Sequence, residues 1–178
     1  MVATKEPLST IILLGIHAGL RIKAEGLTLL WRDIDLIRGT LTVQAAHAKN
    51  KQERTVPLNS VLRNALKNLK ARAEGEYVFT SHTGEPFRSI RTAFTTACRN
   101  ASLTDITPHV LRHTFASRLV MAGVDLRTVQ ELGGWKDLKM VMRYAHLSPA
   151  HKAEAVEKIV NYSTTLFTTS QISPAVNH

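Results

Sequence analysis

Cysteine is almost absent from this chain, since Cys98 is the only one among 178 residues. A single thiol cannot close an internal disulfide or build a cysteine zinc site, and this fits a reducing cytoplasm. Acidic residues are also scarce, because 14 Asp and Glu face 23 Lys and Arg and leave a formal net charge of +9. This charge favours a polyanionic partner bound in a salt-dependent way, although a basic protein that binds no polyanion has the same composition.

Long apolar runs are missing as well. The run from Ile11 to Ile16 is far shorter than the roughly 18 residues that a membrane-spanning helix needs, and no signal-cleavage pattern follows it. We therefore expect no membrane partner. An apolar content of 44% suits one globular domain with a sizeable core, placed at residues 1–162, whereas residues 163–178 are polar and predict a flexible tail.

Hydrophobic periodicity predicts an α+β fold that is mostly helical, with one small antiparallel sheet. Asn59 or Ser60 is typical of a helix N-cap, and Thr83 to Pro86 of a turn. The predicted helices cover residues 8–18, 22–30, 60–73, 89–100, 108–122, 125–132 and 137–145, and the predicted strands cover 40–43, 54–57 and 77–80.

The segment that begins at Thr107 combines a helix start with two polar side chains on one face. Thr107 suits the N-cap and Pro108 the first helical position, where a missing N–H costs nothing. His109 and Arg112 lie three residues apart and share a face. The N-terminus of a helix favours phosphate. Taken alone, each of these side chains would more often be structural.

Tyr144 is the candidate nucleophile. A tyrosine hydroxyl with an ordinary pKa of about 10 attacks only beside cations and a proton acceptor. A phosphodiester in transfer spreads negative charge over its oxygens, and two guanidinium groups, here Arg21 and Arg112, can neutralise it without a metal. Lys49 lies in a polar loop between two predicted strands and could reach a leaving oxygen. With Trp135, these residues predict a metal-free phosphodiester-transfer site.

In chain order these residues resemble the catalytic domain of the tyrosine recombinases, the phage integrase family. The family pattern is Arg, Lys, His-x-x-Arg, His or Trp, and Tyr, and the likeness continues around these positions over about 150 residues. The six positions are Arg21, Lys49, His109, Arg112, Trp135 and Tyr144, and the flanking matches are Leu29 to Asp35, Arg54 to Leu58 and Leu111 to Ala116.

The resemblance implies site-specific recombination or integration of double-stranded DNA in a bacterium or phage, without metal, ATP or another cofactor. The two arginines would clamp the scissile phosphate, and Trp135 would donate a hydrogen bond to it. Tyr144 would attack with help from His109, while Lys49 protonates the departing 5′ oxygen. The product would be a 3′-phosphotyrosyl link that another 5′ hydroxyl can reseal.

Two positions depart from the family pattern. Most members have His where this chain has Trp135, whose indole can donate a hydrogen bond but cannot shuttle a proton. Proton transfer is therefore left to His109 and Lys49. The acidic residue that usually lies three residues after the first Arg lies four after Arg21, at Glu25. Both spacings face one side of a helix, so Glu25 could orient His109 or Arg21.

Other polar residues near the motifs are expected to assist. His109 and His113 have the spacing of a two-histidine metal site, but no Glu follows His109 as in a metalloprotease helix, so we predict no metal. We expect His113 to be a core or supporting histidine. The predicted supporting residues are Glu25, His113 and His146, and the predicted DNA contacts are Lys51, Arg54 and Arg143.

The family also implies an assembly. After Ser148 and Pro149 the pattern predicts a helix with an apolar stripe, which in the family often docks on a neighbouring protomer, giving a tetramer on two duplexes. Packing on its own domain fits this stripe equally well. Arg21 is so near Met1 that the separate N-terminal, core-binding DNA domain of the family is expected to be absent. The stripe consists of Ala150, Ala153, Val156, Ile159 and Val160.

Three other functions stay open on the sequence. A type IB topoisomerase shares the chemistry but would relax DNA as a single protomer. A non-catalytic DNA-binding module would bind without forming an adduct, and a histidine-metal nuclease would lose activity in a chelator. We favour the recombinase, as a cytoplasmic protein associated with the nucleoid.

Overall fold

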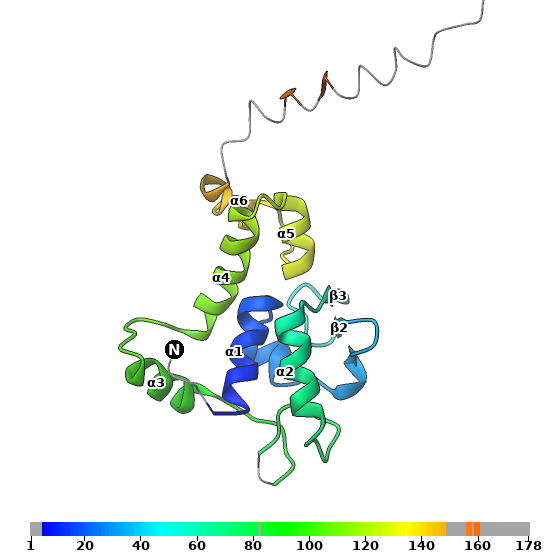
Figure 1. Cartoon of the computed structure of the whole chain (residues 1–178), viewed down its shortest axis with the longest axis vertical. Helices are drawn as coiled ribbons and strands as arrows, with labels where there is room; N and C mark the ends of the chain where they lie inside the picture. Colours follow the sequence, from blue (N-terminus) through cyan, green and yellow to red (C-terminus); the bar gives the residue numbers. More distant parts are fainter. Residues whose placement is uncertain (1–4, 82, 149–155, 158, 161–178) are drawn as a thin grey trace, which may run out of the picture. The chain divides into compact units, whose positions relative to one another are not determined.

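The computed structural model describes residues 5–81, 83–148, 156–157 and 159–160. The chain divides into two units, Met1–Ser148 and Pro149–His178, and the first contains every helix and strand named here (Figure 1). The helices are α1 (Leu8–His17), α2 (Ser60–Lys70), α3 (Arg91–Asn100), α4 (Pro108–Met121), α5 (Leu126–Gly133) and α6 (Lys139–Met142), and the strands are β1 (Ile34–Asp35), β2 (Thr40–Val43) and β3 (Arg54–Pro57).

The small sheet confirms the two strands predicted around the Lys49 loop. Its order is β1-β2-β3, all antiparallel, and Val43 pairs with Arg54 at the loop end. β1 was not predicted, because two residues are too short to show an alternating pattern. The predicted strand at 77–80 is wrong, since this segment makes only isolated bridges through Tyr77 and Thr80. The mostly helical α+β fold class is confirmed.

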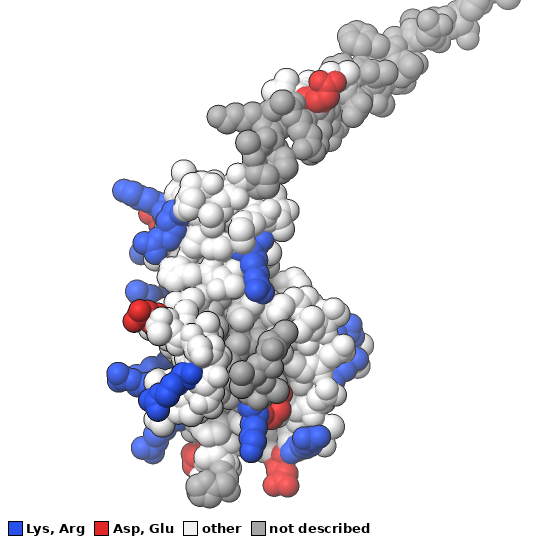
Figure 2. Space-filling view, turned by 60° about the vertical axis from the view of Figure 1, so that its left-hand side comes forward, with Lys and Arg blue, Asp and Glu red and all other residues white. Residues whose placement is uncertain are grey.

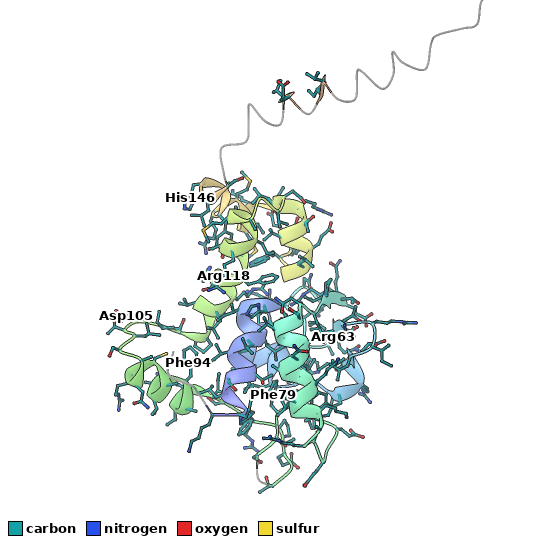
Figure 3. All side chains as sticks on the ribbon, in the orientation of Figure 1. Arg63, Phe79, Phe94, Asp105, Arg118 and His146 are labelled. Atoms are coloured by element: carbon teal, nitrogen blue, oxygen red, sulfur yellow. The ribbon has the colours of Figure 1, made fainter. Side chains whose placement is uncertain are left out.

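Helix α1 lies between α2 and α4, and its apolar side chains form the centre of the larger core (Figure 1). A Cβ on Gly15 would lie 2.6 Å from the Leu111 Cβ, so the glycine permits the close approach of α1 to α4. Phe79 and Phe94, labelled in Figure 3, also belong to this core. Arg63 of α2 donates to the Leu36 and Ile37 carbonyls at 2.8 and 2.7 Å, and so joins α2 to the β1–β2 turn.

A second, smaller core lies between the C-terminal half of α4 and the helices α5 and α6. It is built from Ala116, Val120, Val129 and Val141, and it includes the ring of Tyr144. Helix α4 is therefore shared by both cores, because its first half packs on α1 and its second half on α5. Residues His109 to His113 lie in the first half of α4.

Two predicted helices are not continuous α-helices in the structure. The segment predicted as helix 22–30 is one π-helical turn, Ile22–Gly26, in which the Leu27 N–H donates to the Ile22 carbonyl at 2.8 Å. The helix predicted at 137–145 stops at Met142 and is followed by a 3-10 turn, Ala145–Leu147. Helix α4 begins as predicted, but Thr107 makes no side-chain capping bond.

The stripe predicted after Ser148 falls mainly outside the described residues. Ala150 and Ala153 are not described, whereas Val156, Ile159 and Val160 are helical and exposed. In the described part of the chain, no helix is long and apolar enough to span a bilayer.

Candidate active site

All six positions predicted from the motifs line one cavity of about 390 Å³. The same cavity is lined by His113 and Arg143, which the sequence had placed near the site. It is also lined by Lys139 and Met140 of α6, which sequence reasoning missed. Their only signal in the sequence is that they lie about one helical turn before Tyr144. The lining residues are Arg21, Lys49, His109, Arg112, His113, Trp135, Lys139, Met140, Arg143 and Tyr144.

Arg112 is the most buried cation of the cavity, with 6% of its surface exposed. Its Nη1 donates to the Gly19 carbonyl at 2.5 Å, and its guanidinium stacks 4.0 Å from the centroid of the Trp135 ring. Nη2 is buried and has no hydrogen-bond partner among the described residues. Burial, and then the charge of Arg21, lowers the pKa of Arg112 to about 9, so the group stays protonated at neutral pH.

Arg21 is held by a buried carboxylate. Glu25 accepts from the Arg21 backbone N–H at 2.9 Å and pairs with Arg21 Nη1 at 2.5 Å. The π-helical turn makes this possible, because it carries the Glu25 side chain back over the residue at which the turn begins. Of the two partners that the sequence proposed for Glu25, the structure shows Arg21 and no bond to His109 in its described part.

Arg54, predicted to contact DNA, is instead bonded inside the protein. Its Nη1 and Nη2 donate to the two carboxylate oxygens of Glu25 at 3.1 and 2.8 Å, and its Nε donates to the Leu132 carbonyl at 3.1 Å. Only 9% of the Arg54 side chain and none of the Glu25 side chain is exposed. One arginine therefore links β3, the Arg21 turn and the end of α5, and all its donating nitrogens have protein partners.

Two glycines position the indole of Trp135. A Cβ on Gly133 would lie 1.8 Å from the Trp135 ring, so no larger residue fits there with the ring in place. Gly134 ends α5 in the left-handed conformation, with φ of 66°, and a Cβ there would lie 2.8 Å from Arg54 Cδ. The two glycines let the chain turn sharply, so that the Trp135 ring stacks on Arg112. The centroids of the Trp135 and Tyr144 rings are 6.4 Å apart.

Tyr144 is almost fully buried, with 6% exposed. Burial raises the pKa of Tyr144, although the cations Arg143 and Arg112 oppose the rise, so the phenol is neutral before anything binds. Its Oη shares a short hydrogen bond with Nδ1 of His113. His113 was expected in the core or in support; it is exposed rather than in the core, and it contacts the nucleophile directly.

The other predicted residues have different places. Lys49 and His109 are exposed side chains on the cavity wall. Lys51 is exposed in the same loop as Lys49 but does not line the cavity, so its predicted DNA contact stays a prediction. His146 is exposed, follows α6 at the outer end of the unit (Figure 3), and does not line the cavity.

The lining of the cavity is rich in positive charge. Figure 2 shows lysine and arginine side chains spread over one face rather than gathered in a single patch. The cavity concentrates them, because half of its lining residues are cationic and none is acidic. No cluster of His, Cys, Asp or Glu suited to a metal occurs in the ranges that the structure describes. The cationic lining residues are Arg21, Lys49, Arg112, Lys139 and Arg143.

The family model of the phage integrases matches residues 2–151. The chain belongs to the phage integrase family. Among curated relatives of this family, the integrase of Salmonella phage P22 is 32% identical over 167 residues, which is 87% of this chain and 43% of that protein. The tyrosine recombinase XerC of Bacillus subtilis is 36% identical over 143 residues, which is 73% of this chain and 46% of that one.

Solved structures of phage integrases share the fold. The catalytic domain of bacteriophage HP1 integrase is 27% identical and superposes with a TM-score of 0.65, covering 84% of this chain and 80% of that one. This chain spans less than half the length of these two curated relatives.

Proposed function

We propose that this chain forms the DNA-cleaving and DNA-joining part of a site-specific recombinase or integrase. One observation carries the proposal: Nη2 of the buried Arg112 lacks a partner among the described residues, in a side chain that lines a cavity with Tyr144. An unpaired buried donor on a cation is costly. A phosphate oxygen would supply both the missing acceptor and the counter-charge.

The reaction follows from the groups that meet in the cavity. Oη of Tyr144 bonds to the phosphorus of a DNA strand as the bond from phosphorus to the 5′ oxygen breaks. The products are a 3′-phosphotyrosyl link and a strand with a 5′ hydroxyl, and Lys49 supplies the proton of that hydroxyl. The reverse attack reseals the strand without ATP, because the covalent link keeps the energy of the broken bond.

The cations act mainly on the phosphate. Arg112 and Arg21 neutralise the charge that its non-bridging oxygens carry in the transition state. Trp135 packs on Arg112 and donates its indole N–H to the same group, and His109, exposed on the cavity wall, adds a hydrogen bond to it. Arg143 lines the cavity beside Tyr144 and is the predicted DNA contact that the geometry supports best.

Double-stranded DNA is the substrate under this proposal, and exchange between two duplexes requires several protomers. A tetramer held through the segment after Ser148 remains our prediction, together with a domain ending at residue 162 and a cytoplasmic, nucleoid-associated location. The topoisomerase and the non-catalytic module are not favoured, since the matched relatives carry the names integrase and tyrosine recombinase.

The test is covalent trapping. The chain is incubated in chelator with a library of nicked DNA duplexes of randomised sequence, and protein–DNA adducts that survive denaturant are isolated and sequenced. We expect an adduct that Tyr144→Phe abolishes and that Tyr77→Phe, a matched change outside the cavity, retains. No adduct with any duplex, or one that persists in Tyr144→Phe, would contradict the proposal, and chelator-sensitive nicking would indicate a metal nuclease.

A further inference from the structure

The nucleophile has a hydrogen-bond partner that the motif does not contain. His113 lies on α4, one helical turn after His109, and its Nδ1 is bonded to Oη of Tyr144. The two ring centroids are 5.9 Å apart with an interplanar angle of 54°, so the contact is edge-on through the heteroatoms rather than stacked. The residues are 31 positions apart, and only the packing of α4 against the segment after α6 joins them.

The direction of this bond follows from the protonation of its two groups. Although His113 is exposed, partial desolvation lowers its pKa, and the nearby Arg143, His109 and Arg112 lower it further, so the imidazole is neutral at neutral pH. Burial raises the pKa of Tyr144, so the phenol keeps its proton. The phenol O–H therefore donates, and Nδ1 accepts.

His109 does not occupy this place. Both histidines are exposed and line the same cavity, but His109 makes no hydrogen bond with any described residue, whereas His113 is bonded to Tyr144. The spacing of four residues puts the two histidines one above the other. The one nearer the C-terminus of α4, His113, is the one bonded to the Tyr144 hydroxyl.

We propose that His113, rather than His109, accepts the proton of the Tyr144 hydroxyl as that oxygen attacks the phosphate. The step rests on the proposed function. As the Oη–P bond forms, the proton moves from Oη to Nδ1 of His113, and the bond to the 5′ oxygen breaks with a proton from Lys49. In the resealing direction, His113 returns the proton to Oη.

The surroundings favour transfer only when DNA is present. The charged and titratable groups around His113 are His109 and Arg112 on α4, Arg143 at the end of α6, and Lys139, which lines the same cavity. None of these groups is acidic and three of them are cationic, so they oppose a charged imidazolium at His113 in the empty site. A bound phosphate adds negative charge beside it and reverses this effect. Trp135 cannot replace the histidine, because an indole N–H only donates.

The hydrogen bond itself can be tested without DNA. The nitrogen resonances of the histidine side chains are recorded in the wild-type chain and in Tyr144→Phe. We expect Nδ1 of His113 to be the unprotonated nitrogen and to shift on loss of the hydroxyl, while the His109 resonances stay in place. If the His113 nitrogen resonances do not shift in Tyr144→Phe, the proposal is overturned, even if the chain forms an adduct with DNA.

The catalytic role is tested on a duplex recovered by trapping, with His113→Asn, which keeps an acceptor but cannot take a proton. General base catalysis is worth about 10²–10⁴-fold, so we expect the rate of adduct formation to fall by that factor and to keep rising with pH where the wild-type rate has levelled. His146→Asn is the matched control and should react like the wild type, since His146 lies outside the cavity.

A sulfur-substituted duplex separates the two proton transfers. A 5′-bridging phosphorothiolate has a leaving thiol that needs no acid, so Lys49→Met should regain activity on it and His113→Asn should not. If His113→Asn regained activity on the phosphorothiolate, or reacted at the wild-type rate on ordinary DNA, the role of His113 would be refuted while the proposed function would stand. Absence of any wild-type adduct would refute the proposed function and this step with it.

Discussion

Replacing Arg54 with methionine should destabilise the protein much more than the same change at an exposed arginine. Arg54 makes two charge-assisted hydrogen bonds to Glu25, at 3.1 and 2.8 Å, and a third to the Leu132 carbonyl at 3.1 Å. The side chains of Arg54 and Glu25 are 9% and 0% exposed, so water cannot replace the lost partner. Arg127 and Glu131 form a comparable pair in which 68% and 63% of the side chains are exposed.

The magnitude follows from what each change leaves behind. Breaking a buried pair costs about 3–5 kcal/mol, because one charge stays buried without compensation. For Arg54→Met we expect the lower end, about 3 kcal/mol, since Arg21 still pairs with Glu25 at 2.5 Å. An exposed pair contributes about 0–1 kcal/mol, which is the expected cost of Arg127→Met. At about 2–4 °C per kcal/mol, Arg54→Met should lower Tm by roughly 6–12 °C.

The assay is thermal unfolding followed by calorimetry and circular dichroism, with agreement of the two as the check on two-state behaviour. Combining Arg54→Met with Glu25→Gln should recover part of the lost free energy, because the second change removes the uncompensated charge. Equal losses from Arg54→Met and Arg127→Met, or a loss under about 1 kcal/mol at Arg54, would show that this network does not stabilise the fold as we have argued.

Two further predictions concern the same region. Gly19→Ala should lower the free energy of unfolding by about 1–3 kcal/mol, because φ is 65° there and a Cβ would lie 2.4 Å from the Phe115 ring, whereas Gly75→Ala, with nothing within 4 Å, should be neutral in the same denaturant titration. Burial alone would raise the pKa of Glu25, but the hydrogen bonds and charges of Arg54 and Arg21 outweigh burial and lower the pKa from 4.5. Its stabilisation is complete above the unfolded pKa and lost as pH falls through the folded one, so the unfolding free energy of Glu25→Gln should decline less steeply below pH 4.5 than that of the wild type. An unchanged acid limb would contradict this.

The local signals in the sequence were sufficient for most elements. Strands 40–43 and 54–57 have the predicted bounds, and Asn59 caps α2 through a bond from the Leu62 N–H at 3.0 Å. These succeed because alternation and capping depend on residues only a few positions apart. The segment after Arg21 was misjudged for the opposite reason, since its π-helical turn is stabilised by the distant Arg54 rather than by helical periodicity.

The six motif positions could be found from the sequence because their order along the chain resembles the family pattern, and the fold brings all six to one cavity. Their partners could not be found in this way. His109 and His113 carry the same local evidence, and only the packing of α4 decides which one meets Tyr144. Arg54 looked like a DNA contact because a basic residue beside a catalytic loop is usually solvated.

The sequence by itself determined the fold class, the positive charge and the chain order of the cavity residues, because each is written in composition or local spacing. The tertiary structure alone decided which side chains are neighbours. Arg54 reaches Leu132 across 78 positions, and Arg112 reaches the Gly19 carbonyl across 93. Such contacts depend on how distant elements exclude water from one another, and no periodicity within an element records that.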